Sequence, residues 1–393
     1  MKYVMVSSIS DGGKSGAVSV AGEIAQLGII NGFNKLENKI DKIFSYSPNR
    51  IFPNGPLIYK GGLSNVWKTE ICFLPYINLP VIKWISLNVI LFFKLIAFAK
   101  KDDVVFFYNY SYPSGWAGLV GKLVKKYKLF AIIFDIHVPG QTVKNSIRWK
   151  FEYFTYKYLL PKTDKIVVIS NEIAKDFSPV VPSLLVEGGI SPHIIQNIAS
   201  IEYKSKYNKI PFKIGFAGRL DDDNCVAEIL RAADILEKKG IPVEFNIVGN
   251  GKYFNEVKQA ASVSRKIIFH GQVTHTKSIE IMKQQHLNLC IRATKKIHTR
   301  YFFPSKLLEY LFLGVPVLTT NIPFSQGEMQ KYAFVLDGEE AEDISKAILE
   351  IINCSLPNIQ DKLAECDKIK QEFFWDSQVS RIQKFFQGVD FGE

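Results

Sequence analysis

The sequence predicts an α/β protein of two domains, each a parallel sheet flanked by helices. Its 393 residues exceed what one core usually fills, and 47% hydrophobic content is enough for two cores. Short apolar runs alternate with longer helical stretches in both halves, which is typical of parallel sheets covered by helices. We expect a first domain at residues 1–200, a second at 201–370 and an amphipathic helix at 371–393.

The first domain begins with a strand at residues 2–8, a glycine loop and a helix at 17–27. Gly12 and Gly13 allow a sharp bend and a close approach of the backbone to a ligand. The loop lacks both the GxGxxG spacing of a dinucleotide site and the GxxxxGK[ST] spacing of a P-loop. An ordinary turn therefore remains an equal alternative to a ligand-binding loop.

Polar loops follow two later strands of this domain. FDIHVPG carries Asp135 and His137, and VEGGI carries Glu187. Both loops stand at carboxyl ends of strands, where open α/β sheets bind ligands. His137 can hold or relay a proton, although a lone histidine is more often a satisfied structural group. The other strands expected here are 104–108, 130–134, 165–169 and 183–186, with helices at 114–127 and 145–159.

A second alternation follows a linker at residues 191–211, which lacks clear periodicity. Arg219 comes directly after a strand, so its guanidinium can reach a phosphate bidentately at the carboxyl edge of the sheet. The alternative is a surface ion pair with the acidic run at 221–223. We expect strands at 213–218, 243–248 and 266–271, and helices at 224–239, 252–262 and 275–285.

Residues 286–320 are read as strand, basic loop, short helix, glycine stop and strand. Pro304 suits a first helical turn, and Lys306 would reinforce the free N–H groups of that helix start as an anion site. Glu309 shares a helix face with Ser305 and is placed to accept hydrogen bonds from the paired hydroxyls of a ribose. Together these features suggest a nucleotide. The alternative is a solvated glutamate and a surface lysine.

The charge and the cysteine pattern of the chain indicate which classes of ligand it can bind. The net charge is +11, but basic and aromatic residues are not interleaved in a nucleic-acid-binding motif, so phosphorylated substrates or anionic lipid are favoured over nucleic acid. The five cysteines show neither paired spacing nor CxxC, which predicts no disulfide framework and no zinc site. The first residues lead straight into a strand and not into a signal peptide, so we expect a cytoplasmic protein.

Residues 79–99 form the most apolar segment of the chain. Lys83, Asn88 and Lys94 interrupt it, and a spanning helix needs about 20 predominantly apolar residues, so a helix that does not span a membrane is expected. It either covers a sheet as a core helix or contacts a membrane surface through Trp84 and the phenylalanines.

Five segments together resemble family 4 glycosyltransferases of the GT-B fold, in particular bacterial enzymes that build capsular and other surface polysaccharides. They are FAGRLDDDN, FNIVGNGKY, IIFHGQV, the run from IRATKK to VLTT, and the tail that contains EFFW. The resemblance covers nearly the whole chain. It implies two Rossmann-like domains that face each other across a cleft, with a C-terminal helix that crosses back to the first domain.

The resemblance also implies roles for residues of the second domain. It places a nucleotide sugar there, with Glu309 on the ribose, and with Arg219, Lys306 and the helix start at Pro304 and Ser305 on the diphosphate. The backbone from Gly271 to Val273 would lie beside the base.

The first domain would bind the acceptor, with His137 near the transferred sugar and the loop of Gly12 and Gly13 near the phosphates. No metal or other cofactor is expected, because cationic side chains stabilise the leaving diphosphate. The chain departs from the family pattern at two positions. Tyr301 stands where the first glutamate of a carboxylate pair is usual, and Asn224 stands where a lysine is usual.

The expected function is retaining transfer of a hexose from a nucleotide diphosphate sugar to a saccharide or lipid-linked saccharide in bacterial surface polysaccharide synthesis. UDP is favoured over GDP. The protein would be cytoplasmic and in peripheral contact with the inner face of the membrane. Two alternatives stay open: a non-catalytic nucleotide-sugar-binding subunit, and a nucleotide-sugar epimerase of the same fold.

Overall fold

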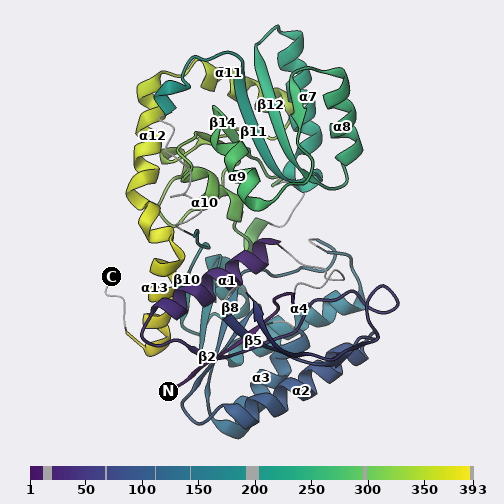
Figure 1. Ribbon diagram of the computed structural model, residues 1–393. Coiled ribbons are helices and arrows are strands. Elements are labelled where there is room, and N and C mark those ends of the chain that lie inside the picture. Colours follow the sequence, from purple (N-terminus) through teal and green to yellow (C-terminus); the bar gives the residue numbers. More distant parts are fainter. Residues whose placement is uncertain are drawn as a thin grey trace. The chain divides into compact units, whose positions relative to one another are not determined.

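A computed structural model describes residues 1–11, 20–66, 69–110, 112–141, 143–191, 203–294 and 299–389. The chain forms two compact α/β units, each built on its own sheet (Figure 1). The sequence placed the domain boundary at residue 200 and the final helix from 371, whereas the units divide at 189 and 374. The first unit comprises Met1–Gly189, Thr299–Phe303 and Trp375–Glu393, and the second comprises Ile190–His298 and Pro304–Phe374.

The sheet of the first unit has the strand order β10-β9-β8-β7-β1-β2-β5-β4. Neighbours are parallel except β4, which runs antiparallel to β5 at one edge. The sequence predicted β1, β7, β8, β9 and β10 but missed β2, β4 and β5. The strands are β1 (Tyr3–Ser7), β2 (Ile40–Ser45), β4 (Gly62–Val66), β5 (Thr69–Phe73), β7 (Val104–Tyr108), β8 (Lys128–Ile133), β9 (Lys165–Val168) and β10 (Ser183–Leu185), and β3 (Ile58–Tyr59) pairs separately with β6 (Tyr76–Ile77).

Helices cover both faces of this sheet. Adjacent residues of a strand point to opposite sides, so two neighbouring side chains of β7 show which helices lie on each face. Phe106 of β7 packs on Phe33 and on Phe386, with ring centroids 5.5 Å apart in both pairs. Phe107 lies on the other face, against Gly118. The helices of this unit are α1 (Val20–Lys35) and α13 (Trp375–Gln387) on the face of Phe106, α3 (Tyr112–Lys125) on the face of Phe107, and α2 (Ile82–Phe98), α4 (Ile147–Leu159) and α5 (Asn171–Phe177).

The C-terminal helix α13 belongs to the first unit. Trp375, which is 3% exposed, packs against two glycines. A Cβ built at Gly28 or Gly189 would lie 2.3 or 2.5 Å from atoms of the indole, so neither position tolerates a side chain without movement. Lys35 of α1 also pairs with Asp376 at 2.7 Å. The tail therefore covers an apolar surface of the first sheet.

The sheet of the second unit is parallel throughout, in the order β13-β12-β11-β14-β15-β16. This is the strand order of doubly wound nucleotide-binding folds. Buried aliphatic residues of α7 and α11 form one core with β11, β12 and β14. The strands are β11 (Phe212–Arg219), β12 (Val243–Asn250), β13 (Ile267–Phe269), β14 (Leu287–Cys290), β15 (Val317–Thr319) and β16 (Phe334–Val335), and the helices are α7 (Val226–Lys238), α8 (Phe254–Val263), α9 (His275–Lys283), α10 (Ser305–Leu311), α11 (Ala341–Ile352) and α12 (Leu356–Ile369).

Candidate functional site

At the carboxyl edge of the second sheet, the ends of β11 and β12 and the residues that follow them are in backbone contact. Gly249 has φ +148°, and a Cβ there would lie 1.9 Å from the carbonyl oxygen of Gly218. Gly251 has φ +155°, and its Cβ would lie 2.5 Å from the carbonyl oxygen of Leu220. Only glycine permits this approach without strain. The glycines therefore let the two strand ends pack closely against each other at this edge.

Lys306 lies in the first turn of α10, and its ammonium group is held at this edge. The Nζ atom donates a hydrogen bond to the carbonyl oxygen of Ala217 in β11 at 2.5 Å. Burial lowers the pKa of Lys306, and the negative charge of Glu309 acts in the opposite direction. The same carbonyl also accepts a hydrogen bond from the hydroxyl of Tyr310 at 3.1 Å. The lysine is thus directed at a strand end and not into solvent.

Glu309 lies one turn further along α10, where its side chain is only 16% exposed. His275 Nε2 is 2.9 Å from Oε1 of Glu309. This hydrogen bond raises the pKa of His275 against the opposing effect of its burial. Among the described residues, Oε2 of Glu309 receives no hydrogen bond, so one carboxylate oxygen remains for a ligand. The sequence reasoning missed His275, whose signal was its position at a helix start.

Arg219 extends from the end of β11 and is 69% exposed. Its guanidinium forms ion pairs with Asp221 through Nε and with Asp223 at 3.2 Å. The side-chain amide of Asn224 donates to the carbonyl oxygen of Arg219 at 2.9 Å and to Oδ1 of Asp221 at 2.7 Å. The surface ion pair that the sequence left open is therefore the arrangement that this structure contains, and Asn224 stabilises the turn.

The remaining predicted residues of the second unit border the same edge. Gly271 has φ +65°, and its carbonyl oxygen accepts a hydrogen bond from the N–H of Gly249 at 2.8 Å. Half-buried Val273 follows, close to the start of α9. Pro304 is buried and directly precedes α10, whose first residue, Ser305, is exposed. The structure thus gathers Arg219, Lys306, Glu309, Gly271, Val273, Pro304 and Ser305 around the carboxyl ends of β11, β13 and β14.

His137 belongs to the first unit, in the loop after β8. Its Nε2 atom is 3.6 Å from Oδ2 of Asp135, and its ring packs edge-on against Trp149 with centroids 4.6 Å apart. Burial raises the pKa of the nearby Glu152 carboxyl group, and the charge of His137 partly offsets this increase. The predicted loop residues Gly12 and Gly13 lie outside the described residues.

Tyr301 is an anchor within the first unit. It is 7% exposed, and its hydroxyl donates to Oδ2 of Asp176 at 2.5 Å. The ring packs against Phe177 with centroids 5.3 Å apart. Arg300 pairs with Glu172 at 2.7 Å and with Asp176 at 2.9 Å. The position that the resemblance assigns to a sugar-binding glutamate therefore holds a packing residue in this chain.

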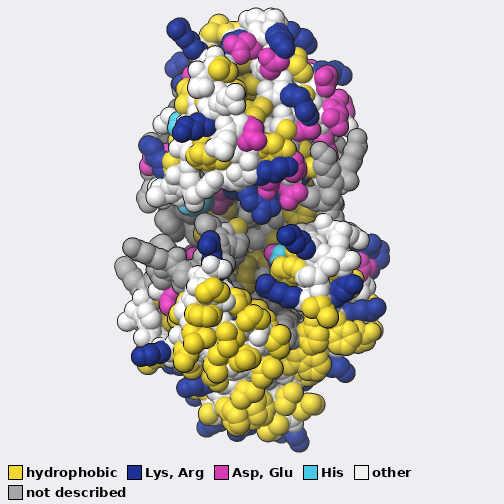
Figure 2. Space-filling view, turned by 90° about the vertical axis from the view of Figure 1, so that its right-hand side faces the viewer, with side chains coloured by type: hydrophobic (Ala, Val, Ile, Leu, Met, Phe, Trp, Pro, Cys, Tyr) yellow, Lys and Arg dark blue, Asp and Glu magenta, His cyan; other side chains and the backbone are white. Residues whose placement is uncertain are grey.

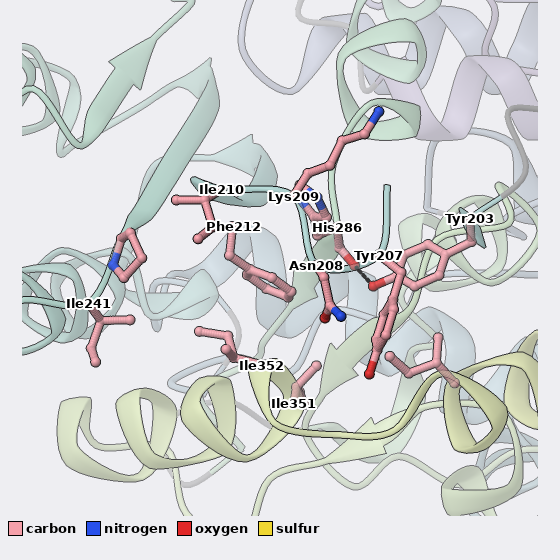
Figure 3. A pocket seen from close by; sticks show the side chains of 12 residues that line it. Tyr203, Tyr207, Asn208, Lys209, Ile210, Phe212, Ile241, His286, Ile351 and Ile352 are labelled. Carbon is pink, nitrogen blue, oxygen red and sulfur yellow. Dashed lines mark hydrogen bonds between the residues drawn. The ribbon is translucent and has the colours of Figure 1, made fainter. Parts of the chain in front are cut away.

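A cavity of about 300 Å³ opens at the opposite, amino edge of the second sheet (Figure 3). His286 lies here with both ring nitrogens satisfied, since Nδ1 accepts from the N–H of Lys213 at 2.8 Å and Nε2 is 2.9 Å from the carbonyl oxygen of Lys206. The hydroxyl of Tyr203 donates to the carbonyl oxygen of His286 at 3.0 Å. This cavity is separate from the predicted nucleotide residues. It is lined by Tyr203, Tyr207, Asn208, Lys209, Ile210, Phe212, Ile241, Pro242, His286, Ile351, Ile352 and Ile359.

A protein-family model matches most of the second unit, and solved structures match the fold of the whole chain. Residues 198–371 match the family model described as "Glycosyl transferases group 1". Sucrose-phosphate synthase from Thermosynechococcus elongatus is 13% identical, with 99% of each chain covered and a TM-score of 0.68. A trehalose-6-phosphate synthase, described for glycosyltransfer with retention, is 13% identical over 99% of this chain and 100% of that chain, with a TM-score of 0.69. HepE from Anabaena, in complex with UDP and glucose, is 13% identical over 99% of this chain and 100% of that chain, with a TM-score of 0.63.

No curated protein sequence matches this chain. At such low identity the structural likeness concerns the fold, and it confirms the predicted GT-B architecture. The family model covers the part of the chain that contains Arg219, Lys306 and Glu309.

Proposed function

We propose that this chain, a glycosyltransferase with the GT-B fold, moves a hexose with retention from a UDP-sugar to a saccharide or lipid-linked saccharide. We place this reaction in the cytoplasm, in bacterial surface polysaccharide synthesis. One observation carries the proposal. Lys306 and Glu309 lie one turn apart on α10, at the carboxyl edge of the sheet in the unit that matches the glycosyltransferase family. His275, the first residue of α9, bonds to Glu309 there.

Glu309 is the proposed ribose-binding residue. Its Oε1 is bonded to His275. Its Oε2 would accept hydrogen bonds from the ribose hydroxyls. A carboxylate fixed by a second side chain binds without losing rotamer freedom on each encounter, which favours affinity. The backbone from Gly271 to Val273 would then lie beside the base. HepE, which shares this fold, binds UDP, and this supports a uridine nucleotide as the ligand.

Lys306 and Arg219 are the proposed cations for the leaving diphosphate. Charge grows on the diphosphate as the sugar–phosphate bond breaks, so fixed cations stabilise the transition state more than the bound substrate. Arg219 must exchange Asp221 and Asp223 for the phosphates. The Arg219 side chain is 69% exposed, and ion pairs of an exposed cation contribute only about 0–1 kcal/mol, so this exchange costs little. With these cations in place, we propose transfer that is independent of metal.

Retention is proposed by analogy with the trehalose-6-phosphate synthase described for transfer with retention. His137 in the acceptor-binding first unit is the proposed contact for the transferred sugar. Its ring is oriented by Trp149, and its Nε2 lies near Asp135, so a proton at that atom has a nearby carboxylate to balance it.

One observation favours a second candidate, a nucleotide-sugar-binding subunit without catalysis. Tyr301 is anchored on Asp176, so this position supplies no carboxylate to read sugar hydroxyls. Donor hydrolysis separates the two functions. A transferase releases UDP slowly from its donor without an acceptor, whereas a binding subunit leaves the donor intact.

A thermal-shift screen against UDP, GDP and their sugars tests the proposal directly. A ligand that binds only the folded state stabilises it by about 2.7 kcal/mol at a hundred times its Kd, which raises the Tm. We expect UDP and UDP-hexoses to raise the Tm and GDP to raise it less. A Tm that no nucleoside diphosphate changes would rule out the proposed donor site.

A further inference from the structure

Helix α2 of the first unit is apolar on its exposed side as well as on its buried side. Leu87, Leu91 and Leu95 are buried against the rest of the unit. Four other apolar residues follow one another at intervals of three or four along the opposite face, which is the spacing of one helix stripe. These exposed residues are Ile82, Ile85, Val89 and Phe93, with exposed fractions from 42% to 64%.

Two neighbouring helices extend this apolar surface. Helix α2 packs against α3, and α3 packs against α4. Exposed apolar side chains spread broadly over this unit in Figure 2 (the lower half), with basic side chains along their border. An exposed patch of this extent marks an interaction site and not ordinary surface. We define the apolar face as the four residues of α2 together with Val120, Leu123 and Val124 of α3 and Ile147, Phe151, Phe154 and Tyr158 of α4.

The charges on these three helices are almost all positive. Among residues 82–98, 112–125 and 147–159, Glu152 is the only carboxylate. Its side chain is half-buried, so it adds little negative charge to the surface. Two basic residues of these helices add little to the surface charge, because Lys83 is buried on the carbonyl oxygen of Asn49 and Lys122 pairs with Asp164 at 2.7 Å. The other basic residues on the same helices are Lys94, Lys125, Arg148, Lys150 and Lys157.

An aromatic and cationic cluster borders the apolar face where α2 and α4 begin. The Arg148 guanidinium lies 5.4 Å from the ring centroid of Trp84 and 4.8 Å from that of Trp149. Lys83 Nζ also lies 5.3 Å from the Trp84 ring, but this lysine is buried and donates to the carbonyl oxygen of Asn49, so Arg148 is the exposed cation of the cluster. Tryptophan and basic side chains in this combination are typical of the boundary between hydrocarbon and lipid headgroups.

We propose that the apolar face docks on an anionic lipid bilayer, with α2, α3 and α4 lying in the plane of the membrane surface. The apolar stripes would enter the acyl boundary while the basic residues contact lipid phosphates, so that burial and surface charge act together. Among the described residues, no helix has the length and apolarity of a membrane span.

A second copy of the chain fits this face less well. In a twofold dimer the same patch meets itself, so the exposed cations Lys94, Arg148, Lys150 and Lys157 would face one another, and the three helices supply no exposed carboxylate to pair them. An anionic lipid surface supplies the missing negative charge. The charge pattern therefore selects the bilayer over self-association.

The docking surface also specifies the acceptor, a step that rests on the proposed glycosyl transfer. His137 packs against Trp149 at 4.6 Å, and Trp149 belongs to the aromatic cluster on the border of the apolar face. An acceptor that reaches His137 from this side would come out of the bilayer. We therefore assign a lipid-linked saccharide, and not a free one, as the acceptor class.

Vesicle co-sedimentation with the full chain tests the docking surface. We expect binding to phosphatidylcholine vesicles that contain phosphatidylglycerol, weaker binding to phosphatidylcholine alone, and a decrease with added salt. The triple variant Phe93→Asp, Leu123→Asp and Ile147→Asp should lose affinity by about tenfold or more, because it puts carboxylates into the apolar face. The three native side chains are 64%, 71% and 88% exposed, so the fold should persist.

The matched control replaces apolar residues of similar exposure elsewhere. Val180→Asp and Val263→Asp change side chains that are 84% and 81% exposed and lie off the apolar face. These variants should bind vesicles like the wild type. Loss of binding in the controls, equal binding by the triple variant, or no binding of the wild type to anionic vesicles would each overturn the proposal. A dimer in sedimentation velocity that the triple variant abolishes would show instead that a second copy covers the face.

The donor site is measured separately. The UDP-dependent rise in Tm is recorded without vesicles and should be the same in the wild type and the triple variant. Loss of vesicle binding with an intact UDP response therefore concerns the membrane surface alone, and an absent UDP response in both proteins concerns the proposed transferase function alone. A transfer assay with a lipid-linked and a free saccharide then decides the acceptor class, and equal rates with both would contradict our assignment.

Discussion

The carboxyl edges of the two sheets are built in different ways. In the second unit, Lys306 is fixed on the carbonyl oxygen of Ala217 at 2.5 Å, and Glu309 is fixed on His275 at 2.9 Å. In the first unit, His137 is 3.6 Å from Asp135 and is positioned chiefly by the ring of Trp149. One edge orients its charges by short hydrogen bonds within a polar network, whereas the other relies on aromatic packing beside an exposed apolar surface.

The difference fits the two ligands that we propose for these edges. A nucleoside diphosphate presents the same charges and hydroxyls in every turnover, so rigid, hydrogen-bonded partners suit it and strengthen transition-state stabilisation. Aromatic rings offer contact area without demanding one hydrogen-bond geometry, which suits a saccharide carried by a lipid. The following predictions test whether the two edges differ in this way.

The largest effect is expected from Lys306→Ala. If the lysine stabilises the leaving diphosphate, kcat should fall about a hundredfold or more while KM rises less, because the interaction strengthens as the bond breaks. Folding should be kept, since the hydroxyl of Tyr310 still donates to the carbonyl oxygen of Ala217. Steady-state kinetics with a UDP-sugar measure both parameters.

Tyr310→Phe is the matched control, because it removes the other hydrogen bond to the same carbonyl. It should leave kcat nearly unchanged. It should lower stability by about 1–3 kcal/mol, since it also leaves the buried N–H of Ala217 without its acceptor.

Adding Asn224→Lys to Lys306→Ala should restore part of the lost turnover by returning a cation beside Arg219. The rescue stays partial because the Asn224 amide no longer stabilises the turn. Near-normal turnover in Lys306→Ala would make this lysine structural.

A smaller effect is expected from Glu309→Ala. Loss of a charged acceptor for the ribose hydroxyls should weaken UDP binding by about 1.5–3 kcal/mol, which is roughly tenfold to a hundredfold. Glu280 provides the comparison, because it is exposed on α9 and pairs only with Lys277 at 3.0 Å among the described residues. Glu280→Ala should bind UDP like the wild type. Equal affinities of the two variants by calorimetry would contradict the ribose assignment.

The smallest effect concerns pH and His275. The hydrogen bond to Glu309 raises the pKa of His275 in the folded protein. The pair therefore contributes stability that is fully present below the unfolded pKa, about 6.5, and is lost as pH rises through the higher folded value. Urea unfolding should show that His275→Gln costs about 0.2–1 kcal/mol at pH 6 and less at pH 9. A difference that grows with pH would contradict the pairing.

Local pattern was sufficient for much of the fold. The apolar run at 104–108 predicted β7 (Val104–Tyr108), and the periodic stretch at 145–159 predicted α4 (Ile147–Leu159). Strands β2 and β4 were not predicted, because neither is a continuous apolar run. Residues 40–45 carry two consecutive charged side chains, Asp41 and Lys42, and β4 is an exposed edge strand whose position is set by pairing with β5.

By itself the sequence determined the order of the elements, the glycine-rich strand ends and the position of Lys306 and Glu309 on one short helix, because these depend on neighbours a few residues apart. Only the tertiary structure decided which partners those side chains have. His275 and Glu309 are 34 residues apart in the chain, and Tyr301 and Asp176 are 125 apart. Periodicity likewise predicted an apolar helix at 79–99 but not which side stays exposed. That depends on how much of each helix the sheet and its neighbouring helices cover, and only packing in three dimensions fixes it.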